Sequence, residues 1–196
     1  MPTPHNNPDP SGYDGGSHLT ASENPIMTVL PLAVLFAAFA VAADPPAVKF
    51  GKLAAEVPKD WKAEKPANRL RSHQFKLPAG VEGLADAELY VMPQSDPNPD
   101  KSFPRWKASF IPPDGAKVSK IEVSGATVHL LDVSGTWKYR ERPFDPKSKE
   151  ELRPEYRAVW AIVVHGDEAT HLRLSGPRAV VAKHYSVFEK WLRSLR

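Results

Sequence analysis

Apolar and polar residues alternate over three short runs in the first half of the chain, and this period predicts β-strands. The clearest run is 87–92, in which every second residue is aliphatic. Similar runs occupy 48–57 and 72–77, and proline-containing turns follow both of them, as expected at the end of a strand.

The second half of the chain carries longer runs of the same kind. Two of them, 117–123 and 126–139, flank a Ser-Gly pair, which predicts a β-hairpin. Residues 156–164 are apolar at almost every position, which predicts a central strand covered on both faces. The last predicted strand, 169–175, follows after a short turn.

Two segments carry the apolar spacing of helices. A short helix is predicted over 102–111, where Phe103, Trp106 and Phe110 fall on one stripe. A longer helix is predicted after the Gly-Pro pair at 176–177, with an apolar stripe of Val181, Tyr185, Phe188, Leu192 and Leu195. Together these elements predict an α+β fold, a mostly antiparallel sheet of about six strands packed against a C-terminal helix and a short second helix.

The stretch 140–155 interrupts this order. It is rich in charge, contains several prolines and shows no apolar period, so it is predicted to be a surface insertion between two strands. Long ordered loops in small domains are often binding loops, which makes this insertion a candidate for contact with a partner.

An uncharged apolar run at 26–43 precedes the predicted domain. It ends in small residues and predicts a signal peptide over 27–42, which implies a periplasmic or secreted protein. Residues 1–26 are then a disordered extension or precede the true start, 43–49 form a linker, and 50–196 form a single α+β domain. No basic residue precedes the run, and an uncleaved membrane anchor at 26–43 remains the alternative.

Composition excludes several classes of function. The chain has no cysteine, so it has no disulfide, thiolate metal site or cysteine nucleophile. Its 26 Lys and Arg exceed its 23 Asp and Glu only slightly, and acids are scattered among the bases. No basic stripe with interleaved aromatics is present, so we expect no nucleic-acid partner, while weak contact with an anionic membrane surface or polymer stays open. We expect no cofactor.

The sequence contains one group with the residue types of a serine hydrolase, namely His129, Asp132 and Ser134. Side chains alternate faces along a strand, so His129 is predicted to point away from the other two. No G-x-S-x-G motif is present. Asp132 lies in an apolar run and is expected to accept hydrogen bonds from the backbone or an arginine, because a buried acid needs a partner.

A second polar group, His165, Asp167 and His171, flanks one tight turn. A two-residue turn would place the two histidines on opposite faces of the hairpin, and only a three-residue turn would bring them together. No metal-binding motif supports the group, so we predict neither metal ligands nor catalytic residues here.

Aromatic residues bordered by arginines give the strongest binding candidate. Trp137 and Tyr139 share a strand face and lead into the insertion, where Arg157 also lies close by. Such a patch can stack on sugars or dock a protein. The alternative is that Trp137 packs under the final helix while the arginines are solvated. The predicted binding residues are Trp137, Tyr139, Arg140, Arg142, Phe144, Arg153 and Tyr156.

The order of elements from about Phe50 to Leu195 resembles the PsbP-like fold, a superfamily that includes the extrinsic lumenal subunit of photosystem II and exported bacterial proteins. The resemblance rests on Pro58 and Trp61, Arg71 and Phe75 before Leu77-Pro78, Arg105-Trp106, the 132–136 segment, and Ser175-Gly176-Pro177. It implies an accessory or ligand-binding role more often than catalysis. No family residue carries a specific partner over to this chain.

These observations favour a non-catalytic exported accessory protein that contacts an envelope protein or polymer. The alternative is a hydrolase acting on envelope material, with Asp132 or the histidines as candidates. An enzyme would need a concave pocket with converging polar groups, whereas a binding module needs a flatter aromatic patch.

Export is expected to remove everything before Ala43, because the small residues at 40–42 form the cleavage site. N-terminal sequencing of the protein isolated from its native cell measures this directly. A membrane-bound product that still begins at Met27 would instead establish the anchor.

Overall fold

The computed structural model describes residues 46–93, 95–141, 145 and 147–196 of the 196-residue chain. The predicted extension 1–26, the predicted signal peptide 27–42 and residues 43–45 of the predicted linker lie outside the described residues. Within the described ranges, no helix combines the length and apolarity that crossing a bilayer requires.

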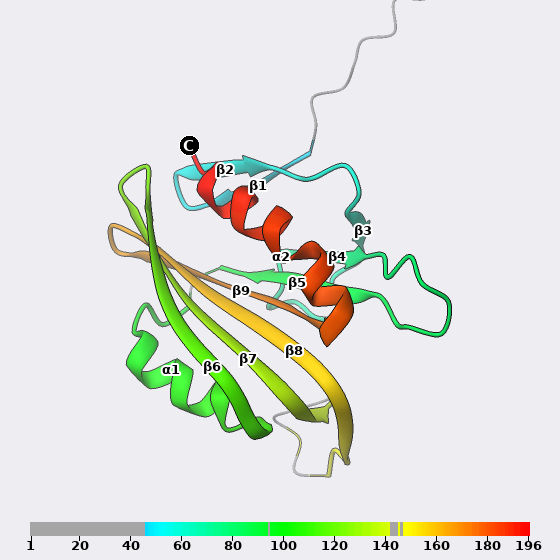
Figure 1. Cartoon of the computed structure of the whole chain (residues 1–196). Helices are drawn as coiled ribbons and strands as arrows, with labels where there is room; N and C mark the ends of the chain where they lie inside the picture. The colour runs from blue at the N-terminus through cyan, green and yellow to red at the C-terminus, as the bar shows by residue number, and fades with distance from the viewer. Residues whose placement is uncertain (1–45, 94, 142–144, 146) are drawn as a thin grey trace, which may run out of the picture. The chain divides into compact units, whose positions relative to one another are not determined.

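The described residues form one seven-stranded antiparallel sheet, one two-stranded hairpin and two helices (Figure 1). The order across the large sheet is β3-β4-β5-β9-β8-β7-β6. The predicted α+β class is confirmed, with β3 as a short strand that the sequence pattern does not reveal. The sheet strands are β3 Lys62–Glu64, β4 His73–Leu77, β5 Ala87–Met92, β6 Phe110–Val123, β7 Ala126–Arg140, β8 Glu150–His165 and β9 Glu168–Pro177.

The predicted strand 48–57 is a hairpin, formed by β1 (Ala47–Phe50) and β2 (Leu53–Glu56). Gly51 turns the chain with a φ of 63°, a left-handed conformation that glycine adopts without strain. The prediction of a linker over 43–49 is therefore wrong from Ala47 onward. Val48 and Phe50 are buried, so this segment belongs to the core.

Helix α2 (Arg178–Arg193) and the β1–β2 hairpin cover one face of the sheet, called the α2 face below (Figure 1). Of the predicted stripe, Tyr185 is half-buried and the other four residues are buried. Trp191 adds an aromatic contact that the stripe does not include, because its ring lies 5.4 Å from Phe50 and 4.9 Å from Trp61. These rings join the hairpin to the helix.

Helix α1 (Pro99–Lys107) covers part of the opposite face, called the α1 face below. The predicted helix 102–111 is displaced towards the N-terminus, because Asn98 caps it by accepting a hydrogen bond from the Asp100 N–H. Phe110 belongs to β6 instead. A second, smaller core forms beneath α1 from Phe103, Phe110, Leu131, Val133, Trp137, Ala158, Trp160, Ile162 and Ala169.

Strand β8 is the central strand that the sequence predicts. Its residues from Ala158 to Val163 are all buried, and their side chains alternate between the two cores. This double burial explains why the segment shows no polar alternation.

The prediction that 140–155 is a surface insertion is wrong for 150–155. Strand β7 runs to Arg140 and pairs with Glu150 at the start of β8, so the connection is confined to 141–149. The ladder here lies beyond the apolar core, and the Arg140–Glu150 ion pair of 3.2 Å takes the place of an apolar contact. That is why the segment shows no apolar period although it forms a strand.

Replacing Phe188 with alanine is expected to lower the free energy of unfolding by about 3–5 kcal/mol, because this ring is 0% exposed in the main core. Denaturant unfolding measures the change.

Val187→Ala on the same helix is the matched control. Its side chain is 39% exposed, so stability should change by less than about 0.5 kcal/mol. Equal effects of the two substitutions would show that α2 does not pack as described.

Candidate functional site

A β-bulge in β8 builds the candidate site. Gly135 pairs with Tyr156, but the next register partners are Trp137 and Arg153, so three steps along β8 oppose two along β7. Glu155 occupies the bulge with a φ of 53°, and the extra residue there interrupts the alternation of side chains between the two faces of the sheet. Arg153 and Tyr156, three residues apart, therefore point to the same face.

Four predicted residues meet there as the Arg153 cluster: Trp137, Tyr139, Arg153 and Tyr156. The Arg153 guanidinium lies 3.6 Å from the centre of the Tyr139 ring and 5.8 Å from that of Tyr156. The Trp137 ring lies 5.1 Å from Tyr139 and 5.7 Å from Tyr156. At these distances the rings attract the cation through their π-electrons and hold it in place.

Trp137 anchors this cluster from below. It is 6% exposed, and its ring stacks on Phe110 in the smaller core on the α1 face. The predicted alternative, in which Trp137 packs under the final helix, is wrong because α2 lies on the other face. Tyr139, Arg153 and Tyr156 are half-buried and form the outer part.

Glu151 fixes the plane of the Arg153 guanidinium. Its two carboxylate oxygens accept hydrogen bonds of 3.0 and 3.1 Å from Nε and Nη2. These bonds raise the pKa of the guanidinium above its usual value and lower that of the carboxyl. The Glu151 side chain is 60% exposed, and exposed ion pairs add little stability, so a competing anion can replace it.

The remaining predicted arginines do not border this cluster. Arg140 follows Tyr139 in the strand alternation, points to the opposite face, and pairs with Glu150. Arg157 also lies on the opposite face, beside Tyr185. Arg142 and Phe144 lie outside the described residues.

Four residues outside the predicted binding set extend the site across the sheet. The Arg173 guanidinium lies 4.8 Å from the Trp137 ring and 4.6 Å from the Tyr90 ring, and Arg71 lies 4.2 Å from Tyr90. Glu88 forms ion pairs with both arginines, at 3.2 Å to Arg71 and 3.5 Å to Arg173. Alternation marks Glu88, Tyr90 and Arg173 as facing away from the main core, but the sequence does not show that β5 pairs with β9.

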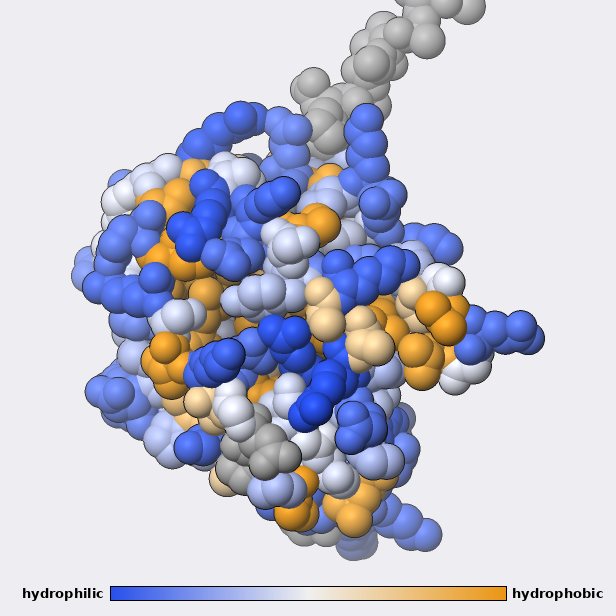
Figure 2. All heavy atoms as spheres, in the orientation of Figure 1, coloured by the Kyte–Doolittle hydropathy of each residue, from blue (hydrophilic) through white to orange (hydrophobic). Residues whose placement is uncertain are grey.

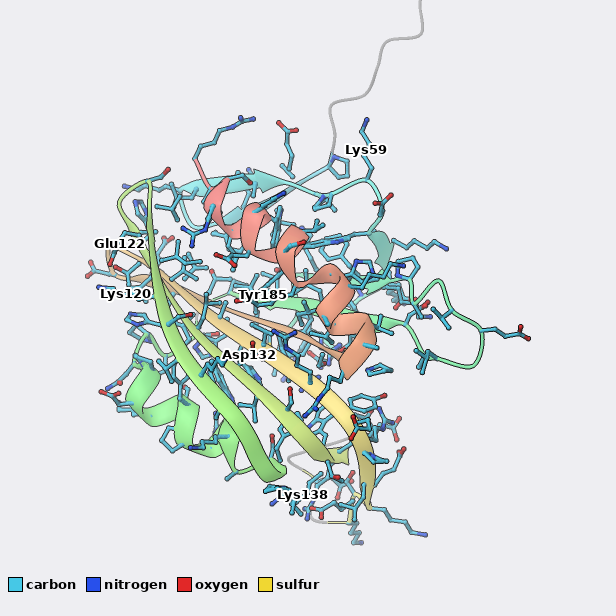
Figure 3. All side chains as sticks on the ribbon, viewed as in Figure 1. Lys59, Lys120, Glu122, Asp132, Lys138 and Tyr185 are labelled. Carbon is cyan, nitrogen blue, oxygen red and sulfur yellow. The ribbon has the colours of Figure 1, made fainter. Side chains whose placement is uncertain are left out.

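On the α2 face, Asp132 accepts hydrogen bonds of 2.8 and 2.6 Å from Arg157 through both of its oxygens, as predicted for a buried acid with an arginine partner. This bond raises the pKa of Arg157, whose guanidinium lies 4.7 Å from the Tyr185 ring, and burial raises the pKa of Tyr185. Asp132 and Tyr185 lie near each other between α2 and the sheet (Figure 3).

This geometry gives the predicted hydrolase residues no catalytic arrangement. Strand alternation places His129 on the α1 face, and Asp132 is committed to Arg157. The surface on the α2 face is mostly hydrophilic, with separate apolar areas (Figure 2). One of these areas is the projecting loop 78–86, where Val81 and Leu84 are exposed.

The second predicted polar group is also separated. A two-residue turn joins β8 to β9, since His165 pairs with Glu168, and His165 and His171 therefore lie on opposite faces. Among the described residues, no three His, Cys, Asp or Glu side chains are grouped to hold a metal ion. The His171 Nε2–H instead donates to the Asp96 carbonyl at 2.8 Å, and its ring meets Trp106 edge-on.

Comparison with solved structures identifies two similar proteins. PA94 from Pseudomonas aeruginosa, a protein of unknown function described as a candidate regulator, is 17% identical with a TM-score of 0.38 over 76% of this chain and 94% of its own. The cyanobacterial PsbP protein (CyanoP) of Synechocystis sp. PCC 6803 is 12% identical with a TM-score of 0.43 over 74% and 85%.

CyanoP is a PsbP protein, from the superfamily that the sequence resembles. The likeness concerns the fold, and neither protein's role is transferred to this chain. Neither a protein-family model nor a curated protein sequence matches the chain.

Acidification below about pH 6.5 is expected to destabilise the protein partly through His171. Burial is the largest cause and lowers the pKa of this imidazole in the folded state. The hydrogen bond to Asp96 and the charge of Asp96 oppose this shift, and Arg105 adds a small effect in the same direction as burial. As the pH falls below 6.5, His171 binds a proton more readily in the unfolded chain than in the folded chain. The free energy of unfolding that this difference contributes is therefore present above pH 6.5 and is lost as the pH falls.

Unfolding free energies of the wild type and His171→Gln, measured between pH 7.5 and 5, test this effect. The variant should lose less stability on acidification than the wild type. His73→Gln should reduce the loss in the same direction, since burial also lowers the pKa of His73, on the opposite face of the sheet. An unchanged pH dependence in His171→Gln would contradict the assignment.

Proposed function

We propose that this chain is a non-catalytic exported protein that binds an envelope protein or polymer through the Arg153 cluster. One observation carries the proposal, namely that the Arg153 guanidinium lies over the Tyr139 ring, 3.6 Å from its centre, in a half-buried position at the sheet surface. A guanidinium held in this way is already oriented for a ligand.

Stacking leaves the hydrogen-bonding capacity of Arg153 largely free. The ring centres lie 3.6–6.0 Å from the central carbon of the guanidinium, which carries five N–H donors. Glu151 accepts from only two nitrogens, Nε and Nη2. A carboxylate or phosphate on the partner would pair with the remaining donors or displace Glu151.

The neighbouring rings add a flat apolar surface to this cation. Tyr139 and Tyr156 are half-buried, so each keeps part of its ring accessible beside Arg153. Tyrosine offers contact area at low entropic cost and a hydroxyl that can hydrogen-bond. The site therefore suits a partner in which an anionic group adjoins a flat sugar or aromatic ring.

Export is part of the proposal. Removal of 27–42 as a signal peptide would release a periplasmic or secreted protein, and retention of 26–43 would leave it anchored to a membrane. Either outcome brings the Arg153 cluster to the envelope. The excess of basic residues over acids is small and would add only weak contact with anionic membrane surfaces.

Arg153→Gln and Tyr139→Ala are each expected to weaken binding to the polymer and membrane-protein fractions of the native envelope by about tenfold, or about 1.4 kcal/mol. Both changes remove the stacked cation that we propose contacts the partner. Co-sedimentation over a range of envelope concentrations measures the loss.

Arg140→Gln is the matched control, because it removes the same charge from the next strand but on the opposite face. It should bind as the wild type does. Equal binding by all four proteins would place the contact surface elsewhere.

A further inference from the structure

Six side chains on the α1 face form one continuous row in which arginines and aromatic rings alternate. Each guanidinium in it lies 3.6–6.0 Å from the centre of the ring next to it. We call this set the arginine row: Arg71, Tyr90, Arg173, Trp137, Arg153 and Tyr139.

Strand register forms two pairs among these side chains, and the contact of 4.8 Å between the Arg173 guanidinium and the Trp137 ring joins the two pairs. Tyr90 on β5 pairs with Arg173 on β9, and Trp137 on β7 pairs with Arg153 on β8. Arg71 immediately precedes β4 and reaches Tyr90 from the other side. From Arg71 beside β4 to Tyr139 on β7 the row crosses four strand spacings, or about 19 Å at about 4.8 Å each.

Positive charge exceeds negative charge in the part of the row farthest from Arg153. Arg71 and Arg173 are only 14% and 16% exposed, and both form their ion pair with the same carboxylate, Glu88. Among the described residues no second acid pairs with either guanidinium. A partly buried charge without full compensation is costly, so this end of the row favours an added anion.

These arginines also have more N–H donors than acceptors among the described residues. Arg173 Nε is buried and has no hydrogen-bond partner among the described residues. Its Nη2 lies 3.5 Å from Glu88, at the limit of a hydrogen bond. Arg71 donates to the Gln74 side chain at 2.7 Å. The contacts between described residues engage Arg71 Nη1 and Arg173 Nη2, so the other Nη atoms of these guanidinia hold N–H donors for an added anion.

We propose that the arginine row binds a linear acidic polysaccharide, with successive carboxylates paired to Arg153, Arg173 and Arg71. This rests on the proposed function, which it extends across the sheet. The forked guanidinium matches a carboxylate with two parallel hydrogen bonds. A linear polymer presents carboxylates at intervals, as the row presents its arginines at intervals across the sheet, before β4, on β9 and on β8.

A protein partner fits this surface less well. Protein interfaces have an apolar centre, whereas none of the large exposed apolar side chains among the described residues belongs to β4, β5 or β9, the strands at the end of the row that holds Arg71 and Arg173. Charge complementarity, rather than apolar burial, therefore selects the occupant.

Binding of polygalacturonate, a linear carboxylated polysaccharide, to the full chain tests the proposal by titration calorimetry. The wild type should bind it, with affinity that falls as salt rises, and should not bind neutral dextran. Arg71→Gln and Arg173→Gln should each weaken binding about tenfold. Arg71→Lys should weaken it too, because an ammonium lacks the fork.

Glu88→Gln is expected to strengthen binding, a result that misfolding of the variant would not produce. It removes the internal carboxylate that competes for Arg71 and Arg173, so it should strengthen polygalacturonate binding several-fold. Arg193→Gln, which breaks an exposed ion pair on α2, is the control for charge alone and should change affinity less than twofold.

Absence of polygalacturonate binding by the wild type, or weaker binding by Glu88→Gln, would overturn the inference. Equal or tighter binding of polyglutamate, a single-stranded oligonucleotide or anionic vesicles through the same arginines would overturn the choice of a polysaccharide.

The two proposals fail separately. If envelope binding depends on Arg153 but not on Arg71, Arg173 or Glu88, the inference is wrong and the proposed function stands. If polygalacturonate binding depends on the row while envelope binding ignores Arg153, the proposed function is wrong.

Discussion

Strand β8 lies between two apolar layers, and the rest of the domain is arranged to supply both of them. Between Ala158 and Val163 each side chain enters the core beneath α2 or the smaller core beneath α1. A shift of one residue would exchange the two sets, so the register of β8 with β7 and β9 is strongly specified. Both helices then dock onto faces that this register has already defined.

The same strand changes role where the core ends. On the N-terminal side of the bulge at Glu155, the side chains of β8 no longer enter the two cores, and Arg153 lies beside Tyr139 instead. The two faces also treat arginine differently. Arg157 on the α2 face has one carboxylate to itself, Asp132, whereas Arg71 and Arg173 on the α1 face share Glu88. The charge of Arg157 is therefore balanced by its own carboxylate, whereas Arg71 and Arg173 together carry one more charge than Glu88 balances.

The parts of the fold that follow a simple period could be predicted from the sequence. Strand 87–92 and the final helix each obey one repeat over their core residues, and the doubly buried strand is apolar throughout its core residues. The errors arose where a single residue ends that repeat. Gly51 divides one predicted strand into two, and Asn98 starts α1 earlier than its apolar stripe. Residues 150–155 pair as a strand through charges, which apolar periodicity does not detect.

About half of the candidate site could be predicted, for a related reason. Trp137 and Tyr139 are two apart on one strand, so alternation alone places them together. The position of Arg153 depends on the bulge, and that of Arg173 depends on which strands are neighbours. Neighbour relations between strands distant in sequence come from the packing of the whole sheet, so local patterns in β5 and β9 do not contain them.

The hydrogen bonds between Ala54 and Arg196 have a consequence for how the domain assembles. The backbone N–H of each residue donates to the carbonyl of the other, and Arg196 also pairs with Glu56, 140 positions away in the sequence. The β1–β2 hairpin and the end of α2 thus complete the main core together. The contacts that bury the hairpin come from residues about 140 positions away in the sequence. Forming them therefore costs conformational entropy of almost the whole domain. Such long-range closure makes for slow folding, in which the sheet centred on β8 would form the template and the hairpin would join last.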